Sequence, residues 1–128
     1  MLDITFYTRE SKEGQVVEVS EEFYQLLIKS DFSKIGKSEK KNMTADEEPV
    51  EVDVVLLEGE NRRKLSDFFR NAIVEETDNI LSKLDELGDS PSSQEYKKTF
   101  GKFSELRKLQ ELRKCVENEE FKYLGRTE

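Results

Sequence analysis

The sequence predicts an α+β fold in a single domain spanning residues 1–128, and three observations support this prediction. Two short N-terminal segments alternate apolar and polar residues, the period of a half-buried β-strand. A β-branched segment follows at residues 50–57. Most of the second half shows the spacing of amphipathic helices. The expected architecture is a small antiparallel sheet with a short helix and a long antiparallel helical hairpin on one face.

The first two strands are expected to form a hairpin. Residues 2–8 and 15–19 both alternate, and the polar segment 10–14 between them ends in Gly14, a turn signal. A short helix over residues 21–29 should follow, because Ser20 is a good N-cap and two glutamates suit the first turn. The apolar positions of the hairpin are Leu2, Ile4, Phe6, Val17 and Val19.

The next segment, residues 33–49, has the weakest periodic spacing of apolar residues in the chain. It is polar, contains Gly36 and Pro49, and has two apolar residues, Ile35 and Met43. We therefore predict a flexible loop here. The β-branched residues 50–57 predict a third strand, and residues 121–124 are a candidate for a final strand that rejoins the sheet.

Two long helices are predicted to fill the second half. The first spans residues 60–87 and the second residues 93–117, and each carries an apolar stripe at helical spacing. Gly88 stands where a C-terminal cap belongs, and Ser92 with Glu95 forms a capping-box pattern. The short break between the helices predicts an antiparallel hairpin.

Composition limits the possible chemistry. There is no histidine, which excludes His-dependent triads and His-ligated zinc, and a single cysteine, Cys115, which we interpret as a small buried helix residue. No phosphate-binding glycine motif and no EF-hand order is present. We therefore expect no cofactor, no metal site and no catalytic residues, although an enzyme using carboxylate, lysine or tyrosine chemistry stays open. Without a long apolar run or a signal-peptide pattern, we expect a cytoplasmic protein with no membrane contact.

Charge is unevenly distributed along the chain. Residues 1–60 hold 15 acidic and 7 basic side chains, and residues 61–128 hold 14 of each, so the net charge of −8 belongs to the first half. This balance argues against direct nucleic-acid binding. One acidic run stands out as a predicted partner-binding surface, because grouped carboxylates steer a basic protein or imitate nucleic-acid phosphates. The simpler interpretation is a solubilising surface. The run consists of Asp46, Glu47, Glu48, Glu51, Asp53, Glu58 and Glu60.

A few residue patterns carry a resemblance. The opening Leu2-Asp3-Ile4-Thr5-Phe6-Tyr7, the helix start Val19-Ser20-Glu21-Glu22 and the ending Cys115 with Phe121-Lys122-Tyr123-Leu124-Gly125 resemble small uncharacterised bacterial proteins. Some of these are similar to the immunity proteins that protect a cell from its own toxins. The resemblance covers about half of the chain and identifies no functional residue. It implies a protein that binds and blocks a toxin domain.

The leading hypothesis is therefore a non-enzymatic protein-binding factor of the inhibitor or immunity type, which binds a basic protein through the acidic run. The alternatives are a homodimeric adaptor or chaperone, suggested by the small apolar fraction of 34%, and an acidic nucleic-acid mimic.

Overall fold

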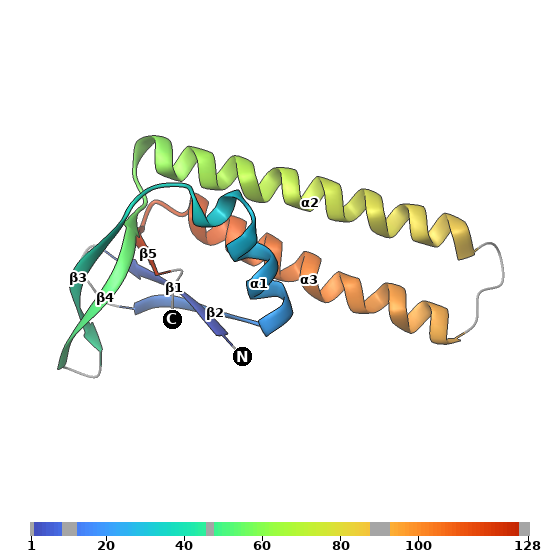
Figure 1. Ribbon diagram of the computed structural model, residues 1–128, viewed down its shortest axis with the longest axis horizontal. Coiled ribbons are helices and arrows are strands. Elements are labelled where there is room, and N and C mark those ends of the chain that lie inside the picture. The colour runs from blue at the N-terminus through green and yellow to red at the C-terminus, as the bar shows by residue number, and fades with distance from the viewer. Residues whose placement is uncertain (1, 9–12, 46–47, 88–92, 126–128) are drawn as a thin grey trace.

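The fold is α+β, with a five-stranded antiparallel sheet and a long helical hairpin (Figure 1). The structure is a computed structural model that describes residues 2–8, 13–45, 48–87 and 93–125. The elements are β1 (Leu2–Thr8), β2 (Glu13–Val19), α1 (Glu21–Lys29), the 3-10 helix η1 (Asp31–Ser33), β3 (Ser38–Ala45), β4 (Glu48–Leu56), α2 (Gly59–Leu87), α3 (Ser93–Glu117) and β5 (Phe121–Gly125).

The strand order is β2-β1-β5-β4-β3, so the last strand lies at the centre of the sheet. Leu124 on β5 is in register with Phe6 on β1 and with Val55 on β4. The candidate strand at residues 121–124 is thus confirmed. Helices α2 and α3 connect β4 to β5, so the central strand of the sheet comes after both helices in the sequence.

The loop prediction for residues 33–49 is wrong over most of its length. Ser38–Ala45 forms β3, which pairs with β4 over its whole length, from Ser38 opposite Val55 to Ala45 opposite Glu48. A neighbouring strand satisfies backbone hydrogen bonds whatever the side chains are, so a polar segment can be a strand. Met43 is its apolar anchor, at 2% exposure against Tyr7 and Val54.

The main core lies between one face of the sheet and the helices. Alternation along β1 sends Phe6 into this core and Tyr7 to the opposite face, where it meets Met43 and Val54 in a smaller cluster. Ser20 caps α1 as expected, accepting a hydrogen bond from the backbone N–H of Phe23 at 3.2 Å. Fully buried side chains of the main core include Ile4, Phe6, Val17, Phe32, Leu65, Phe69, Leu112 and Val116.

The helical hairpin matches its predicted boundaries within one residue. Helices α2 and α3 pack against each other and extend well past the sheet (Figure 1). The predicted cap at Gly88 and the capping box that begins at Ser92 lie outside the described residues. None of the helices, over their described residues, is long and apolar enough to cross a membrane.

Arg62, in the first turns of α2, joins the base of this hairpin to the sheet. Its Nη1 donates to the backbone carbonyls of Val116 at 2.7 Å and Asn118 at 2.9 Å. Its Nη2 donates to the carbonyls of Leu57 at 2.5 Å and Phe121 at 2.7 Å. The cation satisfies a carbonyl in the last turn of α3, at the negative end of that helix. One side chain therefore joins the end of β4, the end of α3 and the start of β5.

Glu117 forms a second contact between the two helices. Its carboxylate accepts from Ser66 at 3.0 Å and Arg70 at 2.7 Å on α2, and from Arg113 at 3.1 Å on α3. Burial acts to raise the pKa of Glu117, but these hydrogen bonds and the charge of Arg113 lower it overall. Glu76 is the opposite case, because burial and the nearby Glu105 raise its pKa.

We expect Arg62→Lys to lower the free energy of unfolding by about 2 kcal/mol or more, because lysine keeps the charge but lacks the planar fork that reaches four carbonyls. Urea unfolding followed by circular dichroism measures this. The control is Arg63→Lys, whose exposed ion pair with Glu60 should contribute under about 0.5 kcal/mol. Equal effects of the two substitutions would contradict the role of Arg62.

Matched Glu→Gln variants should change stability in opposite directions at neutral pH. Glu117, with its pKa lowered in the fold, stabilises above its unfolded pKa of about 4.3, so Glu117→Gln should cost about 1–2 kcal/mol there and little at lower pH. Glu76, with its pKa raised, destabilises the fold above that raised value. Glu76→Gln should therefore stabilise at neutral pH, with the gain disappearing on acidification. Urea unfolding from pH 7 to pH 3 tests both signs.

Candidate functional site

The predicted acidic run follows β4 into the first turn of α2. Asp46 and Glu47 lie outside the described residues, and the other five residues are exposed. On β4, Glu51 and Asp53 alternate with Val50 and Val52, so carboxylates and apolar side chains occupy opposite faces of the strand. We call the five described residues the acidic surface: Glu48, Glu51, Asp53, Glu58 and Glu60.

Basic side chains neutralise part of the acidic surface. Lys40 on β3 lies 3.7 Å from Glu51, and β3 pairing also places it opposite Asp53. Glu60 lies 3.6 Å from Arg63 and 3.9 Å from Lys64 on its own helix. Within the described part of the chain, three carboxylates of this surface have no ion-pair partner. These three are Glu48, Asp53 and Glu58.

A small cavity lies beside the acidic surface, at the inner edge of the β3–β4 hairpin. Its volume is about 270 Å³, below the usual range for small-molecule pockets of about 300–1,000 Å³. Ionisable groups and two hydroxyls converge here from separate strands. Its lining residues are Thr5, Tyr7, Lys40, Glu51, Val52, Asp53 and Gly125.

Apolar side chains accompany the carboxylates on β4. Val50 is 43% exposed and Leu56 is 38% exposed, so the strand offers apolar area to a partner. Lys41 on β3 lies 5.5 Å from the ring centroid of Tyr123, a cation–π contact that covers part of the same sheet face. The hairpin therefore combines charge and exposed apolar area, as protein-binding surfaces do.

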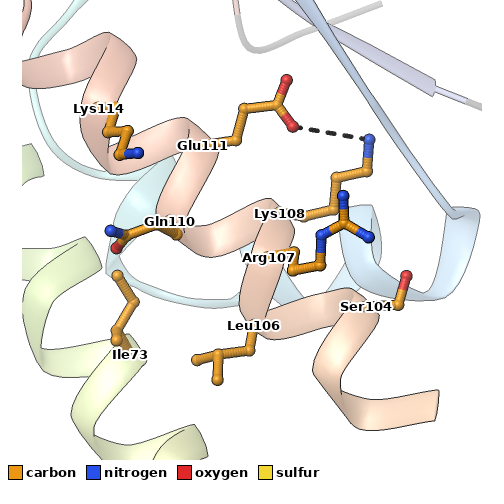
Figure 2. Close-up of a pocket in the computed structure, with 8 residues that line it drawn as sticks. All are labelled: Ile73, Ser104, Leu106, Arg107, Lys108, Gln110, Glu111 and Lys114. Carbon is orange, nitrogen blue, oxygen red and sulfur yellow. Dashed lines mark ion pairs between the residues drawn. The ribbon is translucent and has the colours of Figure 1, made fainter. Parts of the chain in front are cut away.

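A second, larger hollow of about 680 Å³ lies along α3 (Figure 2). Ile73 of α2 and Leu106 of α3 form an apolar part, and Arg107 and Lys114 supply positive charge. Glu111 is already engaged, with Lys108 at 3.9 Å and with Gln15 of β2 at 3.3 Å. Among the residues whose side chains the structure describes, Arg107 and Lys114 have no ion-pair partner.

Carboxylates and one cysteine are the potential metal ligands among the described residues. These residues contain no group of three or more Cys, Asp or Glu side chains placed to hold a metal ion. Cys115 is 2% exposed, which confirms the interpretation of a buried helix residue. Burial, with the charge of Glu111, raises the pKa of Cys115 to about 11. The thiol is therefore protonated at neutral pH and is a poor nucleophile.

Several residues of these surfaces were not found from the sequence. Lys40 was assigned to a loop, and its contact with Glu51 depends on the β3–β4 register. Thr5 and Tyr7 were recognised only as the polar side of a strand. The hollow on α3 was not predicted, because Ile73 comes from the other helix and no sequence pattern connects the two.

Comparison with known proteins gives no relative: no family model, no curated protein and no solved structure matches this chain. The resemblance to toxin-immunity proteins therefore stays a prediction from the sequence alone.

We expect Cys115 to resist thiol reagents in the folded protein. Ellman's reagent should react at pH 8 only at the rate of unfolding, because both burial and protonation protect the sulfur. In denaturing urea the same thiol should react fully within the mixing time. Fast reaction of the native protein would contradict its placement in the core.

Proposed function

We propose that this protein is a non-enzymatic protein-binding factor of the inhibitor or immunity type, which binds a basic protein through its acidic surface. The observation that carries the proposal is the set of three exposed carboxylates without ion-pair partners in the described chain, Glu48, Asp53 and Glu58. Glu58 also interacts electrostatically with Arg62, but none of the three carboxylates forms an ion pair in the described chain, so all three remain available to a partner.

Electrostatic attraction and apolar burial would act together in this binding. The negative charge of the N-terminal half would steer a basic partner toward the surface and increase the association rate. At contact, Val50 and Leu56 would contribute apolar area on the strand face that alternation also gives to Glu48, which supplies affinity that charge alone does not. The Lys40–Glu51 pair interrupts the row of negative charges. We therefore favour docking of a protein over imitation of a regular phosphate backbone.

The test neutralises the three unpaired carboxylates together. A tagged protein first captures its partner from cells of its source, and the purified partner is then titrated by calorimetry. We expect Glu48→Gln/Asp53→Asn/Glu58→Gln to raise the Kd at least about tenfold and to flatten its salt dependence, because long-range attraction is lost.

The matched control removes the same three charges elsewhere. Glu18, Glu21 and Glu22 are exposed on β2 and α1, so their Gln variant has the same net charge. This control should bind with nearly the wild-type Kd. An unchanged Kd in the acidic-surface variant, or an equal loss in both variants, would reject the acidic surface as the binding site.

A further inference from the structure

One lateral face of the helical hairpin exposes apolar side chains where no other part of the described chain covers them. Val74 is 61% exposed and Leu81 is 53% exposed, and both lie on α2. They are seven residues apart, nearly two turns, so they share one side of the helix. Each residue adds about 100° around a helix, so both lie about a quarter turn from Ile73, which lines the hollow on α3. Val74 and Leu81 form an exposed apolar strip on this side of α2.

Charges border this strip on its two sides. On the α3 side, Arg107 and Lys114 are exposed and have no ion-pair partner in the described chain (Figure 2). On the α2 side, Asp67 and Asp78 are exposed, also without an ion-pair partner among the residues described. From α3 to α2, the face therefore carries basic, then apolar, then acidic side chains. We call it the hairpin face.

Such a face is complementary to itself. A two-fold axis parallel to the hairpin exchanges the two edges, so the basic edge of one copy meets the acidic edge of the other. The positions of the charged residues along the hairpin axis agree with this symmetry. Ile73 lies beside Gln110 in the hollow, and the helices are antiparallel, so Asp78 lies level with Arg107 to within about one turn.

We propose that the hairpin face is the interface of a homodimer, in which two helical hairpins pack as a four-helix bundle. Val74 and Leu81 of one copy cover Ile73 and Leu106 of the other, which removes exposed apolar area from water. Arg107 of each copy pairs with Asp78 of the other and sets the orientation. The interface uses none of the residues of the acidic surface, so the proposal does not depend on the proposed function.

Sedimentation equilibrium of the wild-type chain over a wide concentration range is the first measurement. We expect a reversible monomer–dimer equilibrium. Leu81→Glu should raise the dimer Kd at least about tenfold, because symmetry introduces the buried charge twice. The matched control is Leu26→Glu on α1, since Leu26 is 62% exposed and lies on another helix. It should leave the dimer Kd unchanged, and circular dichroism verifies that both variants fold.

A charge exchange tests the orientation. Arg107→Asp alone and Asp78→Arg alone should each weaken the dimer about fivefold, whereas the double variant should recover most of the wild-type Kd. A wild-type protein that stays monomeric into the millimolar range would overturn the proposal. Equal effects of Leu81→Glu and Leu26→Glu, or no recovery in the double variant, would also overturn it. The triple variant of the acidic surface should dimerise normally, which separates this result from the proposed function.

Discussion

The position of Arg62 is the constraint on which the rest of the fold depends. The helical hairpin is inserted between two strands of one sheet, so the chain must leave β4 and return beside it as β5. Four carbonyls from the two ends of this insertion converge on one guanidinium. Only arginine offers enough donors in a rigid plane to satisfy them together. Burial lowers the pKa of Arg62, but Glu119 and Glu58 oppose that change and help to keep the cation charged.

This closure at the base leaves the far part of the hairpin without support from the sheet. Near the base, Leu65 and Phe69 reach the main core, and Glu117 connects the two helices. Beyond it, the described parts of α2 and α3 pack against each other, and a pair of helices can bury only their shared side. The exposed Val74 and Leu81 follow from this geometry. In the proposed dimer, a second copy covers this face.

The sequence predicted the helices and strands whose apolar residues recur at a regular spacing. Strands β1, β2 and β4 and all three α-helices were placed correctly, because burial imposes alternation or helical spacing on their residues. It missed β3, which pairs with β4 through its backbone and buries Met43. The sequence also predicted the acidic run, but it did not predict the basic side chains that form ion pairs with those carboxylates. The contact of Lys40 with Glu51 depends on strand register, and the role of Arg62 depends on carbonyls more than fifty residues away.

The symmetry of the proposed dimer has a consequence for partner binding. A two-fold axis parallel to the hairpin keeps both sheets at the same end of the bundle, so the two acidic surfaces lie at that end, on opposite sides of the axis. A single extended basic partner, or a dimeric one, would then contact both surfaces at once. Its second contact would form at a high effective concentration, and the overall affinity would exceed that of one surface alone. Dimerisation through the hairpin face would in this way strengthen binding at the acidic surface, although the two surfaces share no residue.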